Sequence, residues 1–391
     1  MPVFTPITLP FPPRRILVRG VNWLGDAVMT MPALARLRER FPEAHLALLT
    51  HEKLRDLWSG QPALNEVITL APGEGLFSAC RKLRGRAFDL ALLLPNSPRS
   101  ALEVWLAGIP QRLGYARPWR NWFLTQGIPA RPGRWTMRKR SVGEIQRLVA
   151  TDAPRYVPPA PPESHAHQIH DYLQLVAALG ADQTPLPPRL EVTAAEAHAA
   201  AQKFGIVLDR PVFGLNPGAE YGPAKRWPVE NFIVAAREIQ ERTNCAWLIL
   251  GGKSDVPVAG QIESTLRNPR FSVQNLAGQT SLRELMAVLS QCRVLLTNDT
   301  GPMHLAAALG VPVVVPFGST SPELTGPGLP GDSRHQLLKS DASCSPCFRR
   351  ECPIDFRCLN GIRAERVVAA LMATAGHSTT AAGPRAASAR P

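Results

Sequence analysis

A polar tetrad, Asn-Asp-Thr-Gly at residues 298–301, follows the apolar run CRVLLTN, which is typical of a buried parallel strand. Pro302 then favours the start of a helix, and Gly310 favours its end. Backbone N–H groups at such a helix start can hold a diphosphate, with Asp299 at the strand end and His304 on the first helical turn. The alternative is that these polar residues only cap the helix.

A second loop, NPGAEYGPAKRWP at residues 216–228, ends in Lys225 and Arg226. It follows another apolar run, VFGLN, and its glycines and prolines shape a turn. A lysine at this place can neutralise a departing diphosphate. Alternatively, Lys225 is a surface lysine beside a packed Trp227. Together with a diphosphate site at the tetrad, the lysine forms a coherent set.

Asp26 ends a third loop, VNWLGD, between the apolar run RILVRG and the amphipathic pattern AVMTMPALARLRERFP. A carboxylate there can act as a general base, or it can be the N-cap of the helix. The chain has no dinucleotide fingerprint, no Walker A sequence, and neither an H-E-x-x-H nor a G-x-S-x-G pattern. The chemistry that remains is transfer from a diphosphate-linked donor, with one carboxylate base and a cation that stabilises the leaving group.

Apolar runs alternate with helical patterns in both halves of the 391-residue chain, which predicts an α/β fold with two domains and parallel sheets. Two such domains create a central cleft, and ligands bind at the strand ends that face it. The three loops described above then converge on that cleft. We predict a disordered arm at 1–13, an N-terminal domain at 14–190, a C-terminal domain at 191–362, a closing helix at 363–375, a disordered tail at 376–391, a proline-rich loop at 152–165 and an interdomain linker at 185–192.

The formal net charge is +13, and most of it lies in the first half, where residues 1–190 hold 24 Lys and Arg against 14 Asp and Glu. Between Val104 and Gly143 there are eight basic residues, no acidic residue and four tryptophans. This pattern is typical of a surface for a polyanion, which can be nucleic acid, an anionic membrane or a phosphorylated glycolipid. The alternative is a solvated basic loop.

The seven cysteines fall into two groups. Cys80, Cys245 and Cys292 are isolated, as small core residues are. The other four have the spacing C-x2-C-x4-C-x5-C, which fits zinc or another metal in a reducing compartment, or else free thiols or labile disulfides. In each case we expect a structural role. These four are Cys344, Cys347, Cys352 and Cys358.

Neither a transmembrane helix nor a secretory signal is predicted. The chain has no uninterrupted apolar run of about 18 residues, and the N-terminal sequence MPVFTPITLPFPPRR lacks the basic-then-apolar order of a signal peptide. We therefore expect a cytoplasmic protein.

The motifs GDAVMTMPAL, LLPNSPRSAL, NPGAEYGPAKRWP, NLAGQTSL and TNDTGPMHLAAALGVPVVVPFGSTSP together resemble the bacterial lipopolysaccharide heptosyltransferases of glycosyltransferase family 9, and among them the heptosyltransferase II group. The likeness runs from about residue 15 to residue 330. It implies a GT-B fold of two Rossmann-like domains and inverting transfer of L-glycero-D-manno-heptose from ADP-heptose to the first heptose of the lipopolysaccharide inner core. No metal or other cofactor is implied for the chemistry. A structural zinc at the cysteines is considered from their spacing alone.

The resemblance also implies roles for residues. The family's catalytic Asp falls on Asp26 and its diphosphate-binding Lys on Lys225, while its D-[ST]-G-x-x-H motif falls on Asp299 and the residues after it. The expected donor-binding residues are Gly218, Glu220, Lys225, Arg226, Gly252, Leu276, Asp299, Thr300, Gly301 and His304. The expected acceptor-binding residues are Asn96, Ser97, Arg99, Arg112, Arg117 and Arg120.

The expected partners are ADP-heptose, a lipid A–Kdo–heptose acceptor and the cytoplasmic face of the inner membrane, with peripheral association and no nucleic acid. The four-cysteine segment, the proline-rich arm and the tail are not common to the whole family. Three rival functions are a related transferase with another acceptor position or nucleotide sugar, a GT-B-type epimerase, and a nucleic-acid-binding protein that the charge would explain.

Overall fold

The computed structural model describes residues 7–9, 12–132, 134–151, 166–269 and 271–377. Residues 1–6 and 10–11 of the arm predicted at 1–13 lie outside the described residues, as do the proline-rich stretch at 152–165 and residues 378–391 of the tail predicted at 376–391. The last helix runs to His377, two residues beyond the predicted end at residue 375. Contacts divide the chain into two compact units. The first unit comprises Met1–Thr136, Ala160–Glu191 and Gly328–Pro330, and the second comprises Met137–Pro159, Val192–Pro327 and Gly331–Pro391.

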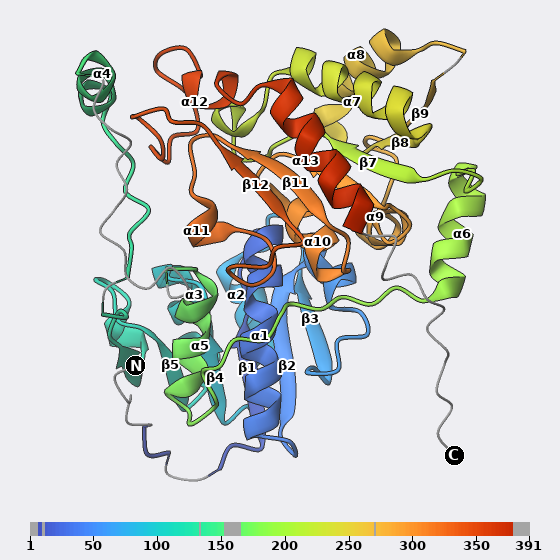
Figure 1. Ribbon diagram of the computed structural model, residues 1–391. Helices are drawn as coiled ribbons and strands as arrows, with labels where there is room; N and C mark the ends of the chain where they lie inside the picture. The colour runs from blue at the N-terminus through green and yellow to red at the C-terminus, as the bar shows by residue number, and fades with distance from the viewer. Residues whose placement is uncertain (1–6, 10–11, 133, 152–165, 270, 378–391) are drawn as a thin grey trace. The chain divides into compact units, whose positions relative to one another are not determined.

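The first unit is built around a six-stranded sheet whose neighbouring strands all run parallel (Figure 1). Apolar sequences such as LALL in β4 are buried throughout, as expected for strands covered on both faces. The order along the sheet is β3-β2-β1-β4-β5-β6, so the chain order reverses between β1 and β4. The strands are β1 (Arg15–Arg19), β2 (His45–His51), β3 (Glu66–Leu70), β4 (Leu90–Leu93), β5 (Gln111–Tyr115) and β6 (Gln126–Ile128).

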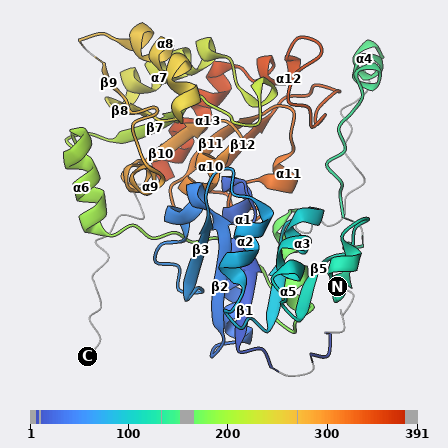
Figure 2. The same cartoon turned by 180° about the vertical axis from the view of Figure 1, so that it is seen from behind.

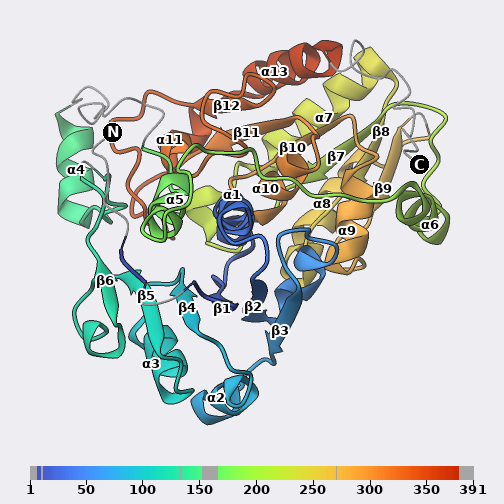
Figure 3. The ribbon, with the colours of Figure 1, turned by 90° about the horizontal axis from the view of Figure 1, so that it is seen from below.

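Helices cover both faces of this first sheet (Figure 3). On one face, α2 and α3 share an apolar core with the strands, in which Leu17, Ala79 and Val104 are fully buried. On the other face, α1 and α5 lie side by side. The helices are α1 (Leu24–Arg40), η1 (Glu52–Trp58), α2 (Leu76–Leu83), α3 (Pro98–Leu106), η2 (Asn121–Phe123) and α5 (Ile169–Ala177).

The second unit repeats this arrangement with a second parallel sheet in the order β12-β11-β10-β7-β8-β9, which reverses between β7 and β10. Its strands are β7 (Val212–Asn216), β8 (Ala246–Ile249), β9 (Ser272–Asn275), β10 (Val294–Thr297), β11 (Val313–Phe317) and β12 (Gln336–Lys339). Its helices are α4 (Val142–Ala150), α6 (Ala194–Phe204), η4 (Pro223–Lys225), α7 (Val229–Thr243), η5 (Lys253–Asp255), α8 (Val256–Leu266), α9 (Leu282–Leu289), α10 (Gly301–Ala308), α11 (Pro322–Thr325), α12 (Arg357–Asn360) and α13 (Ala364–His377).

Aromatic side chains fill the core that α7, α8 and α13 share with one face of the second sheet. Trp227 packs edge-on against Phe232 with ring centroids 5.0 Å apart, and Phe213 packs in the same way against Trp247 at 5.5 Å. The Trp227 indole donates to the Ile362 carbonyl at 2.8 Å, so its polar group is satisfied. On another side of the unit, α6 packs beside α9 (Figure 2).

The helix α4 precedes α5 in sequence but packs within the second unit. Its Ile145 is buried against Cys344 and Cys347. The Arg140 amide, just before the helix, donates to the Cys347 carbonyl at 3.0 Å. The chain therefore leaves the first unit for α4 and returns to it for α5.

The predicted α/β fold with two parallel-sheet domains is confirmed. The two strand orders are mirror listings of one doubly wound arrangement, and in such sheets ligands bind at the strand carboxyl ends where the order reverses. Within the described residues, no helix combines the length and the apolar character needed to span a bilayer.

A buried carboxylate supports the reversal point of the first sheet. Glu103 on α3 is 0% exposed and accepts from the Arg19 side chain, at the end of β1, at 2.9 Å. Its other oxygen accepts from Arg99 at 3.1 Å. Because Arg19 is itself 4% exposed, this is a buried ion pair whose two charges compensate each other.

We expect Glu103→Gln to lower the free energy of unfolding by about 3 kcal/mol, because it leaves the buried Arg19 guanidinium without a counter-charge. Urea denaturation followed by circular dichroism measures the effect. The matched control is Glu52→Gln on η1, whose exposed partner is Arg55 and whose effect should stay within about 0.5 kcal/mol. An unchanged midpoint of urea denaturation for Glu103→Gln would show that the Arg19–Glu103 pair does not stabilise the protein.

Candidate active site

Buried amides join the two strand ends at the reversal point of the second sheet. The Asn216 side chain, at the end of β7, donates to the Thr297 hydroxyl at the end of β10, at 3.0 Å. Asn298, which is 0% exposed, donates to the Pro217 carbonyl at 2.7 Å and accepts from the Trp227 amide at 3.0 Å. One carboxamide thus holds both ends of the loop that carries Lys225.

The structure brings together two residues that were predicted from separate loops. The Lys225 ammonium lies 2.6 Å from the Asp299 carboxylate, and the two side chains are 14% and 4% exposed. The Thr320 hydroxyl donates to the same Asp299 oxygen at 2.5 Å. Asp299 therefore fixes the position of Lys225, and Thr320 fixes that of Asp299.

The start of α10 carries no side-chain cap. Thr300 is the N-cap residue, yet its side chain makes no capping hydrogen bond, and Asp299 turns to Lys225 instead. Pro302 follows at the first helical positions, and His304 is buried. The capping alternative for the tetrad is therefore not observed, and the positive end of the helix dipole stays available for an anion.

Sequence reasoning missed the residues that surround Lys225. The Tyr221 ring centroid lies 5.0 Å from the Lys225 ammonium and 5.2 Å from the Arg350 guanidinium. The Tyr221 hydroxyl donates to the Phe348 carbonyl at 2.9 Å, and the Ala224 amide donates to the Arg350 carbonyl at 3.0 Å. A second cation, supplied by the four-cysteine segment, therefore lies near the lysine.

The remaining donor candidates lie at the carboxyl ends of neighbouring strands. Gly218 follows β7, and a Cβ there would come within 2.2 Å of the Asp255 carboxyl group, so the close approach requires glycine. The Gly252 amide, after β8, donates to that carboxylate at 2.9 Å. Leu276, after β9, is buried, and Arg226 donates to the Ala219 carbonyl at 3.3 Å. Glu220 in the same loop is exposed.

The four-cysteine segment packs against the end of β11. The Cys347 amide donates to the Ser319 carbonyl at 3.1 Å, and the Ser345 hydroxyl donates to the Gly318 carbonyl at 2.7 Å. Cys344, Cys347, Cys352 and Cys358 are all free thiols, and burial raises the pKa of Cys358 to about 12. Across the described ranges, no group of three or more His, Cys, Asp or Glu side chains is arranged as metal ligands, so zinc stays a prediction without a ligand set here.

In the first unit, Asp26 lies in the first turn of α1, at the edge where β1 ends. The N-cap residue is Trp23, so the capping alternative for Asp26 is wrong. Asp26 is partly buried. Its negative charge acts on Tyr172 of α5: the burial of Tyr172, and next the charge of Asp26, raise the pKa of the Tyr172 hydroxyl well above the ordinary value. A carboxylate in this place can take a proton from a ligand at the strand ends.

The acceptor candidates make contacts within the first unit that the sequence did not predict. Arg120 is 0% exposed and donates to the Pro95 carbonyl at 2.8 Å, and its Nε and Nη2 atoms have no partner among the described residues. Burial lowers the pKa of Arg120 to about 10, which keeps it charged near neutral pH. Asn96 accepts from Arg120 at 3.4 Å.

The other acceptor candidates have partners of their own. On α3, the Ser97 hydroxyl caps the helix and Arg99 pairs with Glu103. Around β5, the Arg112 side chain donates to the Phe123 carbonyl, and the Arg117 amide donates to the Asn121 side chain.

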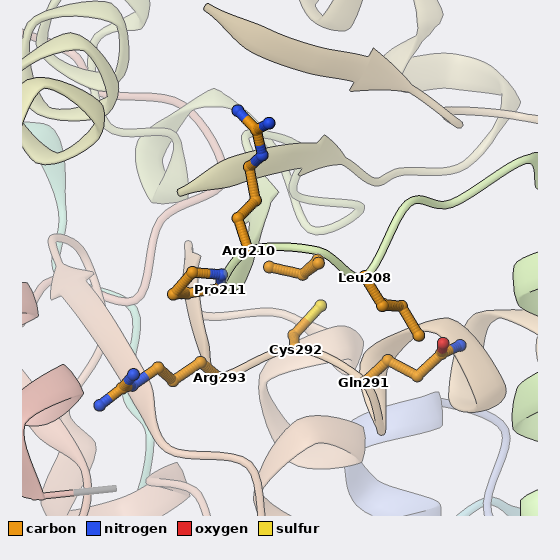
Figure 4. Close-up of a pocket in the computed structure, with 7 residues that line it drawn as sticks. Leu208, Arg210, Pro211, Gln291, Cys292 and Arg293 are labelled. Atoms are coloured by element: carbon orange, nitrogen blue, oxygen red, sulfur yellow. The ribbon is translucent and has the colours of Figure 1, made fainter. Parts of the chain in front are cut away.

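Two pockets lie away from these strand ends. One is lined by Leu208, Arg210, Pro211, Val212, Gln291, Cys292 and Arg293 (Figure 4). These residues precede or begin β7 and β10, so the pocket lies at the amino edge of the second sheet. The other includes Pro13, Ala44 and Leu179, and lies at the amino edge of the first sheet. Since ligands of such folds bind at the carboxyl edge, neither pocket competes with the candidate site.

The proposed base and the proposed cation belong to different units. Asp26 lies in the first unit, whereas Lys225 and Asp299 lie in the second. The cleft predicted between the two domains therefore stays a prediction.

Comparison with known proteins assigns these motifs to one family. The model of glycosyltransferase family 9 (heptosyltransferase) matches residues 146–356. The chain is 31% identical over 320 residues to lipopolysaccharide heptosyltransferase 2 of Escherichia coli, covering 80% of this chain and 85% of that protein. It is also 31% identical over 322 residues to lipooligosaccharide heptosyltransferase 2 of Haemophilus ducreyi, covering 80% and 86%.

A solved structure agrees with the sequence comparison. The structure of Escherichia coli ADP-heptose LPS heptosyltransferase II superposes with a TM-score of 0.74 at 26% identity, covering 93% of this chain and 99% of that chain. The two chains thus share the same fold along almost their whole length.

We expect Asn298→Ala to destabilise the protein by about 2 kcal/mol or more, because the buried Trp227 amide and Pro217 carbonyl lose their shared partner. Thermal and urea unfolding measure this effect. Asn360→Ala is the control, since that exposed side chain donates only to the Asp355 carbonyl at the surface. Equal losses for the two variants would mean that the Asn298 bridge contributes nothing specific.

Proposed function

The chain belongs to glycosyltransferase family 9, the heptosyltransferases, and on that premise we propose that it transfers L-glycero-D-manno-heptose from ADP-heptose onto the first heptose of the lipopolysaccharide inner core. The observation that carries this proposal is the Lys225–Asp299 pair at the reversal point of the second sheet. Two relatives named heptosyltransferase 2 are each 31% identical to this chain over 80% of its length. Their names support the choice of the second heptose as the sugar that is added.

The second unit binds the donor in this proposal. The start of α10, with Thr300 and Gly301, holds the diphosphate through backbone N–H groups and the helix dipole. Lys225 lies beside it and neutralises the charge that develops on the diphosphate. Asp299 accepts from heptose hydroxyls, and His304 lies one turn along the helix. The negative charge of Asp299 alone would repel the phosphates of the donor, and the ion pair with Lys225 offsets that repulsion.

The other donor residues contribute shape in this proposal. Gly218 leaves room for the Asp255 carboxyl group, which accepts from the Gly252 amide and so fixes the loop after β8. Leu276 offers apolar contact to the adenosine. Glu220 and Arg226 are the polar groups of the loop that we assign to the donor sugar and phosphates.

The first unit binds the acceptor in this proposal, with Asp26 as the general base. The acceptor hydroxyl oxygen forms a bond to C1 of the heptose while the bond from C1 to the phosphate oxygen breaks, which inverts the configuration at C1. The proton passes to Asp26, and the electron pair leaves with ADP. A positioned carboxylate supports such a step by about a hundredfold or more.

Charge neutralisation by Lys225 and by the start of α10 makes a divalent cation unnecessary for the chemistry in this proposal. Arg350, across the Tyr221 ring, adds a second positive charge to the same place.

Acceptor recognition is assigned to the carboxyl edge of the first sheet. Arg120 has two nitrogen atoms without partners among the described residues, and Asn96 lies next to it, which supports an anionic group of the core sugar there. Ser97 and Arg99 follow β4, and Arg117 follows β5, so they belong to the same edge. Arg112 lies instead at the amino end of β5 and donates to the Ile109 and Phe123 carbonyls, so its assignment to the acceptor has no support from its position. The acceptor is a lipid A–Kdo–heptose glycolipid, so the enzyme works in the cytoplasm at the inner membrane, as a peripheral protein without a nucleic-acid partner.

We expect Asp26→Ala to lower kcat about a hundredfold or more while ADP binding is kept, because only proton transfer is lost. Calorimetry with ADP and a turnover assay measure the two quantities. Glu39→Ala, an exposed carboxylate at the far end of α1, is the control. Normal turnover in Asp26→Ala would end the base assignment.

Lys225→Ala should weaken ADP binding and lower turnover about a hundredfold, because the cation beside the diphosphate is removed. The exposed Lys203 on α6, which pairs with Glu284, provides the control variant Lys203→Ala. Tight ADP binding by Lys225→Ala would show that the lysine does not face the diphosphate.

The acceptor is tested by offering ADP-heptose together with core acceptors that carry either no heptose or one, followed by mass spectrometry. We expect one heptose to be added only to the mono-heptosyl acceptor. Transfer only to the heptose-free core would keep the mechanism and change the acceptor position. No transfer to either, with ADP binding intact, would contradict the proposed sugar or acceptor.

A further inference from the structure

Two pairs of aromatic side chains lie at the surface of the first unit, and two of the four rings are almost fully exposed. Trp119 is 77% exposed and Trp122 is 80% exposed, with ring centroids 6.4 Å apart and planes at 72°. Trp105 on α3 is 45% exposed and lies 5.6 Å from Phe123. We call these four residues the tryptophan face. By contrast, Trp58, Trp227 and Trp247 are buried in the core of their units.

The backbone under the tryptophan face is held in place. The loop between β5 and β6 carries Trp119 and Trp122, and the side chain of Arg120 between them is buried and donates to the Pro95 carbonyl after β4. The Arg112 side chain donates to the Phe123 carbonyl at 2.7 Å. The indoles are therefore presented by an anchored loop, and their exposure is a feature of the fold.

The backbone of Trp119 adopts φ +65°, a left-handed conformation that residues with a side chain rarely take. Glycine would adopt it without strain, yet the chain has a large indole there. Strain of this kind persists only where the surrounding structure holds it, and it is frequent at functional sites. The buried Arg120 next to it supplies that hold, so the strained backbone supports a functional role for this loop.

Positive charges surround the tryptophan face. Arg84 donates to the Leu106 carbonyl beside Trp105, Arg112 donates to the Phe123 carbonyl, and Arg117 begins the loop that carries the exposed indoles. No Asp or Glu occurs between Val104 and Gly143 in the sequence. The partner of this surface is therefore anionic, and it accepts apolar rings.

We infer that the tryptophan face inserts its indoles into the headgroup region of an anionic phospholipid bilayer, while the surrounding arginines bind lipid phosphates. Indole rings favour the membrane interface because one edge is apolar and the N–H is polar. Basic residues beside them gain from the negative surface potential. This inference extends the proposed function, since it names the face that meets the membrane, but vesicle binding does not depend on heptosyl transfer.

Other occupants fit these observations less well. A sugar ring stacked on an indole also needs acceptors for its hydroxyl hydrogens, and this stretch has no carboxylate. Single-stranded nucleic acid needs a basic groove that follows its backbone, whereas Trp119 and Trp122 project as an exposed pair. A bilayer needs only protruding rings and nearby positive charge.

The test is sedimentation of the full-length protein with phosphatidylethanolamine–phosphatidylglycerol vesicles and, separately, with phosphatidylcholine vesicles. We expect binding to the anionic vesicles, weakened by added salt. Trp119→Ala with Trp122→Ala should reduce it about tenfold or more, because the apolar rings are lost. The control double variant is Val207→Ala with Leu208→Ala, which removes an exposed apolar pair of the second unit.

Two transfer assays accompany the vesicle assay. Transfer to a deacylated, soluble acceptor should stay normal in the Trp119→Ala/Trp122→Ala variant, and transfer to an acceptor embedded in anionic vesicles should fall. Trp122→Ala alone leaves the strained residue in place, so it provides the same test should the double variant not fold, as judged by circular dichroism. If the wild type shows no transfer at all, the vesicle result still decides the membrane inference.

Several results would overturn the inference. One is a wild-type protein that does not bind anionic vesicles, and another is equal binding by the tryptophan variants. Loss of transfer to the soluble acceptor with unchanged vesicle binding would make the indoles a platform for the acceptor sugar. Binding to single-stranded RNA or self-association that these variants abolish, without vesicle binding, would identify a different partner.

Discussion

The Asn298 carboxamide is the interaction on which the second unit's site depends. It lies fully buried between β10 and the loop after β7, and it bonds to the backbone at both ends of that loop. It ties the loop that carries Lys225 to the residue directly before Asp299, and the Tyr221 and Ala224 hydrogen bonds hold the same loop from the other side. The ion pair, the hydroxyl of Thr320 and the uncapped start of α10 are all arranged around strand ends that this amide holds together.

The two units stabilise their reversal points by different chemistry. The first unit uses a buried charge pair, in which Glu103 on α3 holds Arg19 at the end of β1. The second unit uses the neutral amides of Asn216 and Asn298. Because the two amides are neutral, they add no charge near the site, and the electrostatic field there comes from Lys225, its partner Asp299 and the dipole of α10. In the first unit, by contrast, Glu103 accepts from both Arg19 and Arg99, so this group keeps a net charge of +1.

Much of this fold could be predicted from the sequence, because central parallel strands are short apolar runs followed by polar loops. Two strands, β6 and β12, do not stand out in the sequence, because they lie at sheet edges and are only partly buried, so no apolar run marks them. The helix α4 was missed because a single side chain, Ile145, is buried. Asp26, Lys225 and Asp299 were proposed from their loop positions, and the structure brings the last two together as an ion pair. Thr320 was not proposed. It follows β11, and the sequence does not say that β11 adjoins β10.

The path of the chain through α4 affects how this protein can be recombined with its relatives. The helix lies before α5 in sequence, yet it buries Ile145 against Cys344 and Cys347 of the second unit. No single crossover point therefore separates the two units. A chimera that exchanged the whole N-terminal half would replace α4 and mismatch its contact with the cysteines. Exchange of the first unit of this chain would therefore have to leave α4 with the second unit.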